Sequence, residues 1–335
     1  MYSISNLPTF AQLKKEVFMK KNLYLLVIIM LSGITFISCQ KESTIENEEN
    51  NFTITNENIG YIHNECLKAA YEAIKESPIF DQSSRSLSKV ITIQDVTDVI
   101  GKADVACFKR LGEIKKLSDT ELRNFVNQNL NTQIPEGVYK AMSNMIYNPS
   151  FSYTKDYLTP QYGSNISDLQ KEFLEDFISQ LRNTSSNASL DYVADKMKVK
   201  WYPLAKTQED RSVIASTCNV AQASTDYWTH NISKWKISKI EKSSFRTVCG
   251  ALVGADCACI TELMWMSAIG VLVADKIALV CVGTSLSAGI GQAVNDLIVN
   301  WPSRNAIDNT ISYQEYQKLI LSSRLKAIKA DSSLN

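Results

Sequence analysis

The sequence predicts an all-α protein: an irregular helical bundle around a central apolar helical hairpin, with little or no β structure. After residue 57, apolar residues recur at the three-to-four spacing that places them on one face of a helix. Ser-x-x-Glu and Ser-x-x-Gln sequences, which cap helix N-termini, precede several of these stretches. No long alternation of period two is present, so no β-sheet is expected.

The first part of the chain has the pattern of an export signal. Met19 is followed by two lysines, by largely apolar residues from 23 to 37, and by the small Ser38 before Cys39. This order predicts a secretory signal peptide over residues 1–38, with Met19 as an alternative true start. The apolar stretch is shorter than the roughly 20 residues that span a bilayer.

The end of this signal resembles a lipobox. Residues 36–39 match it, with Phe36 at the position where the family usually has Leu. In that family the cysteine is linked to diacylglycerol, the signal is cleaved before it, and its amine is acylated. Residues 40–42 resemble the short acidic tag that sends Bacteroidota-type lipoproteins to the outer leaflet of the outer membrane.

The resemblance implies that Cys39 is lipidated and that its acyl chains make the lipid bilayer a partner. Several acyl chains hold a protein on a membrane stably, whereas one does so only marginally. The implied location is the outer membrane, lipid-anchored and exposed at the cell surface. In the alternative interpretation, the segment is an ordinary cleaved signal or an anchor helix, and Cys39 has no role.

A tether and a single helical domain are expected after the signal. Residues 39–56 are acidic and rich in Asn, which predicts a flexible segment. Residues 57–335 are expected to fold as one domain. Its predicted helices span residues 58–77, 94–110, 118–130, 135–147, 167–181, 190–198, 206–235 and 312–330. Residues 151–163 are predicted to be loop, and residues 90–93 a short strand or an extended lead-in.

The most apolar part of the domain is residues 248–299, the predicted hairpin. Its charged residues are Asp256, Glu262, Asp275, Lys276 and Asp296. Small residues four apart, such as Gly250 and Gly254, let another helix approach closely. One interpretation is the covered centre of a helical bundle. The other is a membrane-inserting hairpin, but a charge at a bilayer centre costs about 2.5–3.5 kcal/mol, which favours the buried interpretation.

Charge and motifs exclude some classes of function. The chain has 35 basic and 35 acidic residues, and removal of residues 1–38 leaves 31 basic and 34 acidic residues, a net charge of −3. A protein without a basic surplus is not expected to bind nucleic acid. No phosphate-cradling Gly loop, Gly-x-Ser-x-Gly or His-Glu-x-x-His sequence is present, so no cofactor or catalytic residue is predicted.

The cysteines do not have metal-site spacing. Besides Cys39 there are seven: Cys66, Cys107, Cys218, Cys249, Cys257, Cys259 and Cys281. None of the last four forms a C-x-x-C pair, so no metal site is predicted. Since an exported protein can form disulfides, Cys249 or Cys257 is a candidate to bridge to Cys281 across the hairpin.

Two histidines and a group of aromatic residues are candidate sites. His63 lies near the carboxylates Glu57 and Glu65, but the sequence spacing supplies neither histidine with a convincing nucleophile and orienting acid, which favours structural roles for both. Tyr227, Trp228 and Trp235 are candidates for a sugar-stacking binding surface, because their rings present flat apolar faces. The alternative for these rings is packing in the core.

Two short sequences carry a second resemblance. Residues 60–64 read Gly-Tyr-Ile-His-Asn and residues 223–228 read Ala-Ser-Thr-Asp-Tyr-Trp, ahead of the Gly/Ala-containing hairpin. This combination resembles a group of uncharacterised Bacteroidota-type lipoproteins. The resemblance implies a helical architecture and carries no activity with it.

Three functions remain open from the sequence. The first is a membrane-anchored envelope lipoprotein that binds an envelope, polysaccharide or host partner without catalysis. The second is a membrane-active, pore-forming or toxin-like effector acting through residues 248–299. The third is an enzyme with an unrecognised site, which the absence of catalytic motifs makes the least favoured.

Overall fold

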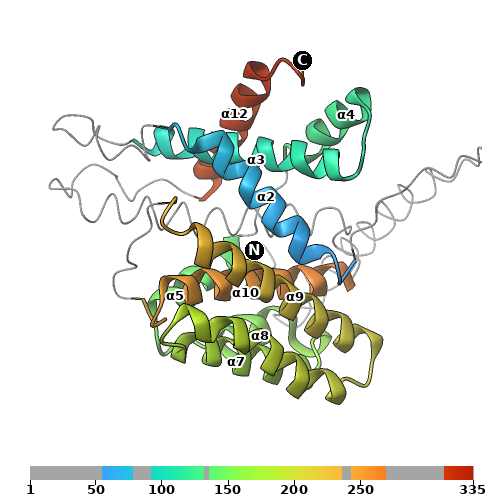
Figure 1. The fold of residues 1–335 in the computed structure, drawn as a ribbon, viewed down its shortest axis with the longest axis vertical. Helices are drawn as coiled ribbons and strands as arrows, with labels where there is room; N and C mark the ends of the chain where they lie inside the picture. Colours follow the sequence, from blue (N-terminus) through green and yellow to red (C-terminus); the bar gives the residue numbers. More distant parts are fainter. Residues whose placement is uncertain (1–54, 78–91, 132–135, 236–242, 269–312, 335) are drawn as a thin grey trace, which may run out of the picture. The chain divides into compact units, whose positions relative to one another are not determined.

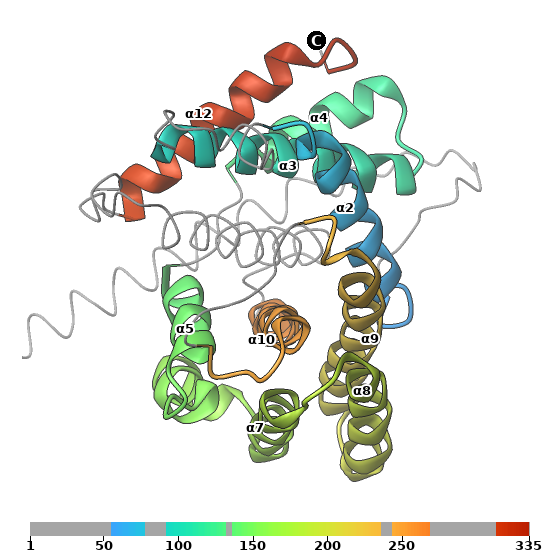
Figure 2. The same ribbon diagram turned by 60° about the vertical axis from the view of Figure 1, so that its left-hand side comes forward.

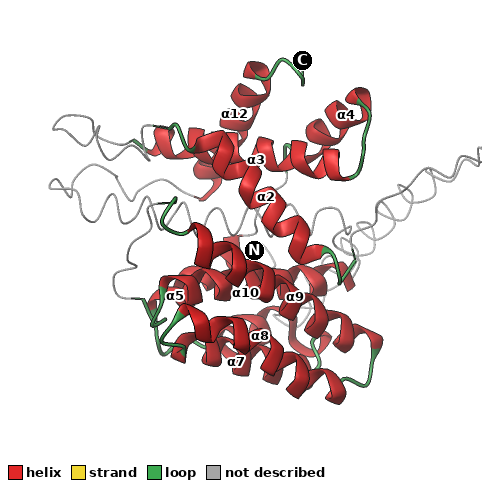
Figure 3. Ribbon diagram, viewed as in Figure 1, coloured by secondary structure: helices red, strands yellow, loops and turns green. Residues whose placement is uncertain are grey.

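The computed structural model is described for five parts of the chain (Figure 1). These are residues 55–77, 92–131, 136–235, 243–268 and 313–334. Every regular element in them is helical and none is a strand (Figure 3), which confirms the predicted all-α class. All belong to one compact unit, Asn51–Asn335. The predicted signal peptide, Cys39, nearly all of the tether and the second part of the hairpin, residues 269–299, lie outside the described residues.

The helices follow the predicted order along the chain. They are α2 (Ile59–Ile74), α3 (Ile93–Ile114), α4 (Asp119–Asn129), α5 (Glu136–Tyr147), α6 (Thr159–Tyr162), α7 (Asp168–Asn183), α8 (Asn187–Trp201), α9 (Gln208–Asn231), α10 (Val248–Ala268) and α12 (Tyr313–Ala330). Shorter turns are the π-helix η2 (Tyr153–Leu158) and the 3-10 helices η3 (Gly163–Asn165) and η4 (Tyr202–Leu204). Each long helix predicted within the described ranges is thereby confirmed.

Side-chain caps begin several of these helices. Ser118 and Glu121 form the predicted capping box of α4, and Ser167 accepts a hydrogen bond from the Gln170 N–H at the start of α7. No cap was predicted for α3, which begins with a capping box formed by Thr92 and Asp95. Thr92 has extended backbone angles, so the end of the 90–93 segment is a lead-in to α3 rather than a strand.

The prediction of a loop over residues 151–163 is wrong. This stretch contains η2, α6 and the start of η3. Ser152 caps η2 by accepting a hydrogen bond from the Lys155 N–H at 3.0 Å. The local sequence gave no sign of these helical turns, because their tyrosines contact residues far along the chain and such contacts leave no local sequence pattern. π-Helices are rare in proteins, and those that do occur are often found at functional sites.

Helix α10 forms the centre of the core. Every residue from 251 to 262 is buried. The helix packs against α5, α7, α8 and α9, and Figure 2 looks along its axis among them. A helix covered on all sides can be apolar on all sides, which explains the composition of this part of the predicted hairpin. Within the described residues, no helix combines the length and apolarity needed to cross a membrane.

Helix α2 connects two groups of helices (Figure 1). One side of α2 packs on α9, and α2 also packs on α3, which in turn contacts α12. The approach of α2 to α9 is close, because a Cβ added at Gly60 would lie 2.5 Å from the carbonyl oxygen of Asn219. Only glycine leaves room for that backbone contact.

Candidate functional site: two buried carboxylates and an open recess

The first buried carboxylate belongs to Asp256, in the middle of α10. Its side chain is 1% exposed, and its Oδ2 lies 3.3 Å from Nε2 of His63, which is also 1% exposed. The same oxygen accepts hydrogen bonds from Ser224 Oγ at 2.5 Å and from Trp228 Nε1 at 3.3 Å. One carboxylate therefore joins α2, α9 and α10.

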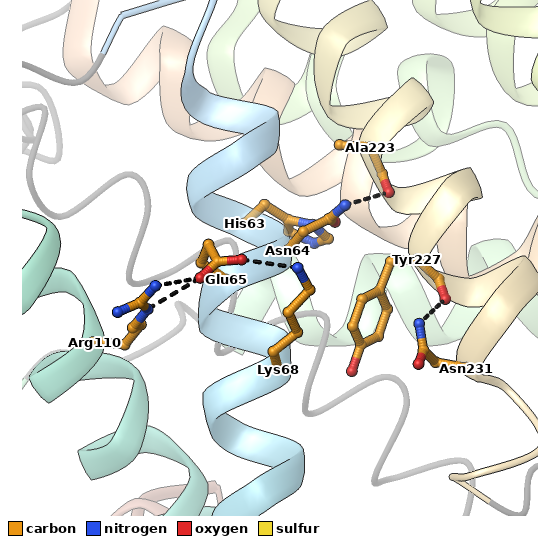
Figure 4. Close-up of polar contacts among 8 residues, drawn as sticks. All are labelled: His63, Asn64, Glu65, Lys68, Arg110, Ala223, Tyr227 and Asn231. Carbon is orange, nitrogen blue, oxygen red and sulfur yellow. Dashed lines mark hydrogen bonds and ion pairs between the residues drawn. The ribbon is translucent and has the colours of Figure 1, made fainter.

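The two short sequences noted above meet at this carboxylate. From the first, His63 pairs with Asp256, and the neighbouring Asn64 donates its Nδ2–H to the carbonyl oxygen of Ala223 at 2.8 Å (Figure 4). From the second, Ser224 and Trp228 donate to Asp256. The resemblance therefore rests on residues that hold α2 and α9 to α10.

The environment of His63 favours its charged form. Complete burial by itself would lower the pKa of the imidazole, but the charge and hydrogen bond of Asp256 outweigh burial, so the pKa of His63 is raised. Nδ1 of His63 lies 3.1 Å from Oδ1 of Asn64, which can accept a hydrogen bond from it. An imidazolium can donate from both ring nitrogens, as this arrangement requires.

This network lacks the order of a hydrolase triad. In such a triad the histidine lies between the serine and the acid and takes the proton of the serine. Here Asp256 lies between Ser224 and His63, and the side chains of all three are shielded from solvent. A substrate has no access to them, which supports the structural role predicted for His63. The other histidine, His230, is 72% exposed and contacts Asp226 one turn earlier in α9.

The second buried carboxylate is Glu262, one and a half turns further along α10. Three tyrosine hydroxyls donate to it: Tyr153 to Oε2 at 2.8 Å, and Tyr157 and Tyr162 to Oε1 at 2.7 and 2.5 Å. The tyrosines come from η2 and α6, the stretch predicted to be loop. Gly137 of α5 leaves space for one ring, since a Cβ there would lie 3.1 Å from Tyr157.

Burial dominates the electrostatics of this second cluster. It raises the pKa of Glu262, and the hydrogen bonds from the three tyrosines oppose the rise without cancelling it. Burial, together with the nearby carboxylate, also raises the pKa of Tyr153, Tyr157 and Tyr162. The hydroxyls therefore remain protonated donors, and the carboxyl group holds its proton to a higher pH than an exposed glutamate.

The aromatic residues considered as a binding surface lie in the core. Tyr227, Trp228 and Trp235 are 3%, 0% and 0% exposed. Their polar edges are satisfied internally, because Trp235 Nε1 donates to the hydroxyl of Tyr227 at 3.0 Å and Trp228 donates to Asp256. The ring of Trp228 also packs edge-to-face against Tyr227 and at a tilt against Trp235, with 5.2 and 5.5 Å between centroids. This corrects the expectation of an exposed stacking surface: the rings fill the space beside α10.

The six described cysteines are all buried and reduced in this structure. Cys249 and Cys257, predicted as disulfide partners, both lie on α10, and burial raises the pKa of Cys249 to about 11. Their proposed partner Cys281 lies outside the described residues, as does Cys39, so those two predictions stand as made. Within the described part of the chain, no group of three or more His, Cys, Asp or Glu residues could hold a metal ion.

An open recess of about 490 Å³ lies where α2, α3 and the C-terminal end of α12 meet. Five of the residues that line it are alanines, contributed by all three helices, and these are referred to as its floor: Ala69, Ala73, Ala106, Ala327 and Ala330. Small side chains leave the helix surfaces low, which is what opens the recess. No part of the sequence indicated it, because the alanines lie on three helices far apart in the chain.

Charged side chains surround this floor, and most are paired. Lys109 donates to Asp331 at 2.6 Å, which ties α3 to the end of α12. Arg110 pairs with Glu65 of α2 (Figure 4) and, at 3.1 Å, with Glu113. Lys102, also on the rim, has no ionic partner among the residues described. Among the described residues that line it, the recess therefore offers one free cation, Lys102, beside an apolar floor.

Comparison with known proteins gives no outside guide to these sites. No family model, no curated protein and no solved structure matches the chain. Function is therefore argued from the geometry of the residues alone. In the sequence, the two important carboxylates differ from other acidic residues in one respect: Asp256 and Glu262 are isolated charges within an apolar helix.

Proposed function

We propose that the protein is a lipid-anchored envelope protein whose helical domain binds a segment of another protein in the recess between α2, α3 and α12. The observation that carries the proposal is the contrast in access. The side chains of His63, Asp256 and Glu262 are buried, whereas the recess is open and combines an apolar floor with charges on its rim. Binding without chemistry needs such a surface and needs no reactive group.

The form of the recess supports a protein segment as the occupant. A helix that lays an apolar face into a groove is a recurring mode of peptide recognition. None of the described residues that line the recess is aromatic, so they provide no flat platform for a sugar ring. Lys102 favours an acidic side chain on the partner, since opposite charges across an interface guide and orient association.

The proposal predicts site-specific capture of a partner in intact cells. A photo-crosslinking residue in place of Ala327, on the floor, should form a covalent adduct with one protein. The same residue in place of Val199, which is 76% exposed on α8, serves as the control and should not. An identical adduct from both positions would indicate non-specific capture and contradict a site at the recess.

Charge reversal tests the part played by the rim. Lys102→Glu should weaken capture roughly tenfold, a loss of about 1.4 kcal/mol of binding free energy. Lys196→Glu, an exposed lysine on α8, is the matched control and should leave capture unchanged. Equal capture by both variants would exclude Lys102 from the interface. Capture of a purified acidic polysaccharide instead of a protein would redirect the proposal to a glycan.

Anchoring is tested separately from binding. Wild-type protein should incorporate a labelled fatty acid and remain with the outer membrane, whereas Cys39→Ser should do neither. Cys249→Ser, a buried cysteine, serves as the control and should behave as wild type. An unlabelled wild-type protein retained equally by membranes would contradict the lipid anchor.

The alternative of a membrane-active effector makes a different prediction. Such an effector would have to withdraw α10 from contact with α5, α7, α8 and α9. Unlipidated protein (Cys39→Ser) is therefore expected to leave dye-loaded liposomes intact. Leakage that depends on α10, and that a crosslink between α9 and α10 prevents, would favour the effector over the binding protein.

A further inference from the structure

Two buried cysteines face each other between α2 and α3. Cys66 is 0% exposed and Cys107 is 2% exposed. The Sγ of Cys107 lies 3.3 Å from the carbonyl oxygen of Cys66, and the Sγ of Cys66 lies 3.9 Å from the carbonyl oxygen of Cys107. Each sulfur is thus in contact with the main chain of the other residue.

This reciprocity distinguishes the pair from Cys257, whose thiol donates to the carbonyl of Thr217, a residue of another type. The helices can approach closely here because Ala70 and Ala103, both 0% exposed, are small. A disulfide requires the two Cα atoms to lie within about 7 Å and the two Cβ atoms about 4 Å apart. Because each thiol reaches the other residue's backbone, the two cysteines are direct neighbours across the interface, as a bridge requires.

We propose that Cys66 and Cys107 form an intramolecular disulfide that fixes α2 to α3 when the chain folds in contact with a disulfide oxidant. The oxidant is a small disulfide such as oxidised glutathione, or a disulfide-bonded oxidoreductase. The bridge closes a loop that contains all residues between the two helices, including residues 78–91, and it lies one turn from the alanines of the recess.

The reaction is two successive thiol–disulfide exchanges. One cysteine thiolate attacks the oxidant, forms a mixed disulfide and releases the first oxidant sulfur as a thiolate. The second cysteine thiolate attacks the protein sulfur of that mixed disulfide and releases the other oxidant sulfur. Each cysteine loses one proton, the pair loses two electrons, and the oxidant is reduced to two thiols.

Burial determines when this exchange takes place. It raises the pKa of Cys107, and the neighbouring Cys66 adds to the rise, so the thiolate that exchange requires is suppressed in the folded protein. Oxidation therefore proceeds while α2 and α3 are still coming together, and the folded interface then protects the bond from reductants. The bridge is structural in this respect rather than a rapidly responding switch.

The inference does not depend on the lipid anchor or on the recess partner, and it is tested on full-length protein in solution. The chain is denatured and reduced, refolded in a mixture of oxidised and reduced glutathione, quenched with acid and alkylated in denaturant. Proteolysis and mass spectrometry should then identify a peptide pair that joins Cys66 to Cys107 and is lighter by two hydrogen atoms than the reduced peptides.

Variants identify which cysteines form the bridge and measure its effect on the melting temperature. Cys66→Ser should remove the linked peptides and leave Cys107 alkylated, whereas Cys218→Ser, also buried, should retain the link. A reductant should lower the melting temperature of the wild type and of Cys218→Ser, but not that of the double variant Cys66→Ala/Cys107→Ala. Alkylation of both Cys66 and Cys107 in folded wild-type protein, or linkage of either to a different cysteine, would overturn the proposal. The wild-type peptide map decides this even where a variant fails to fold.

Discussion

Asp256 and Glu262 lie on the same helix, at the same depth, and are stabilised in different ways. Asp256 has a cationic partner in His63 and two neutral donors, Ser224 and Trp228. Glu262 has three neutral donors, the hydroxyls of Tyr153, Tyr157 and Tyr162. A buried charge is costly unless it is paired and hydrogen-bonded. Asp256 meets that requirement by an ion pair together with hydrogen bonds, and Glu262 by hydrogen bonds alone.

The difference teaches what each cluster tolerates. Among the residues described, His63 supplies the compensating charge at Asp256, so the loss of His63 removes that cation from beside a buried carboxylate. At Glu262 the donors are redundant, and the carboxyl group can also become neutral by keeping its proton, in line with its raised pKa. The Asp256 cluster is therefore expected to be brittle and the Glu262 cluster to be tolerant.

The largest expected effect is that of removing the cation. His63→Leu should lower the free energy of unfolding by about 3–5 kcal/mol, because it breaks a buried ion pair and removes the cation beside Asp256. Urea denaturation followed by circular dichroism measures the change. His230→Leu, at an exposed position on α9, should change it little. A cost for His63→Leu no larger than that of His230→Leu would contradict the ion pair.

The next effect compares the two glycines that make room for the clusters. Gly60→Ala should cost about 1–3 kcal/mol, because its Cβ would overlap the Asn219 carbonyl at 2.5 Å, and backbone cannot move away cheaply. Gly137→Ala should cost less, because its Cβ would meet the ring of Tyr157 at 3.1 Å, and that ring is only half-buried. Thermal unfolding of both variants tests the order, and the reverse order would contradict the close approach of α2 to α9.

The pH dependence of stability follows from both clusters. A raised pKa in the folded state means that the folded protein binds more protons than the unfolded chain, so stability falls as pH rises through that interval. For His63 the loss of stability begins above pH 6.5, the ordinary pKa of histidine. For Glu262 it begins above pH 4.5, the ordinary pKa of glutamate. Each unit of raised pKa corresponds to about 1.4 kcal/mol.

Variants separate the two contributions to this pH dependence. Glu262→Gln should abolish the part of the decline in stability that begins above pH 4.5 and retain the part that begins above pH 6.5. His63→Gln should do the opposite, as measured by urea denaturation at a series of pH values. Stability that rises with pH in both intervals, in the wild type, would contradict the direction of both pKa shifts.

The smallest expected effect is the loss of one tyrosine donor. Tyr157→Phe should cost about 0.5–1.5 kcal/mol, the net value of one hydrogen bond, because Tyr153 and Tyr162 still donate to Glu262. Tyr202→Phe, at a residue 41% exposed, is the control and should have no measurable cost. A loss as large as that of His63→Leu would show that the donors are not redundant and would remove the contrast between the clusters.

The sequence was a good guide wherever a helix depends on nearby residues. The periodicity of α7 and α9 and the caps at Ser118 and Ser167 involve residues three or four apart, and all were confirmed. The same approach failed at residues 151–163. Their helical turns are held by hydroxyl groups that reach Glu262, about 100 residues further along the chain, and no local pattern contains that contact.

The candidate sites divide in the same way. Sequence reasoning favoured a structural role for His63 but could not identify its partner, because Asp256 lies on a helix near the other end of the domain. It singled out Tyr227, Trp228 and Trp235 by their chemistry, yet burial against α10 removes them from any surface. The recess was not foreseen, since alanines on three separate helices give no signal in sequence.

By itself, the sequence determined the order and approximate extent of the long helices, because capping and amphipathic periodicity act within one or two turns of the chain. It also determined that one helix would be apolar on every face. The tertiary structure alone decided which helices would cover that face, which cation and hydroxyls would meet its two carboxylates, and where an open surface would remain. Those outcomes depend on contacts between residues a hundred or more positions apart, and such contacts exist only once the helices have packed.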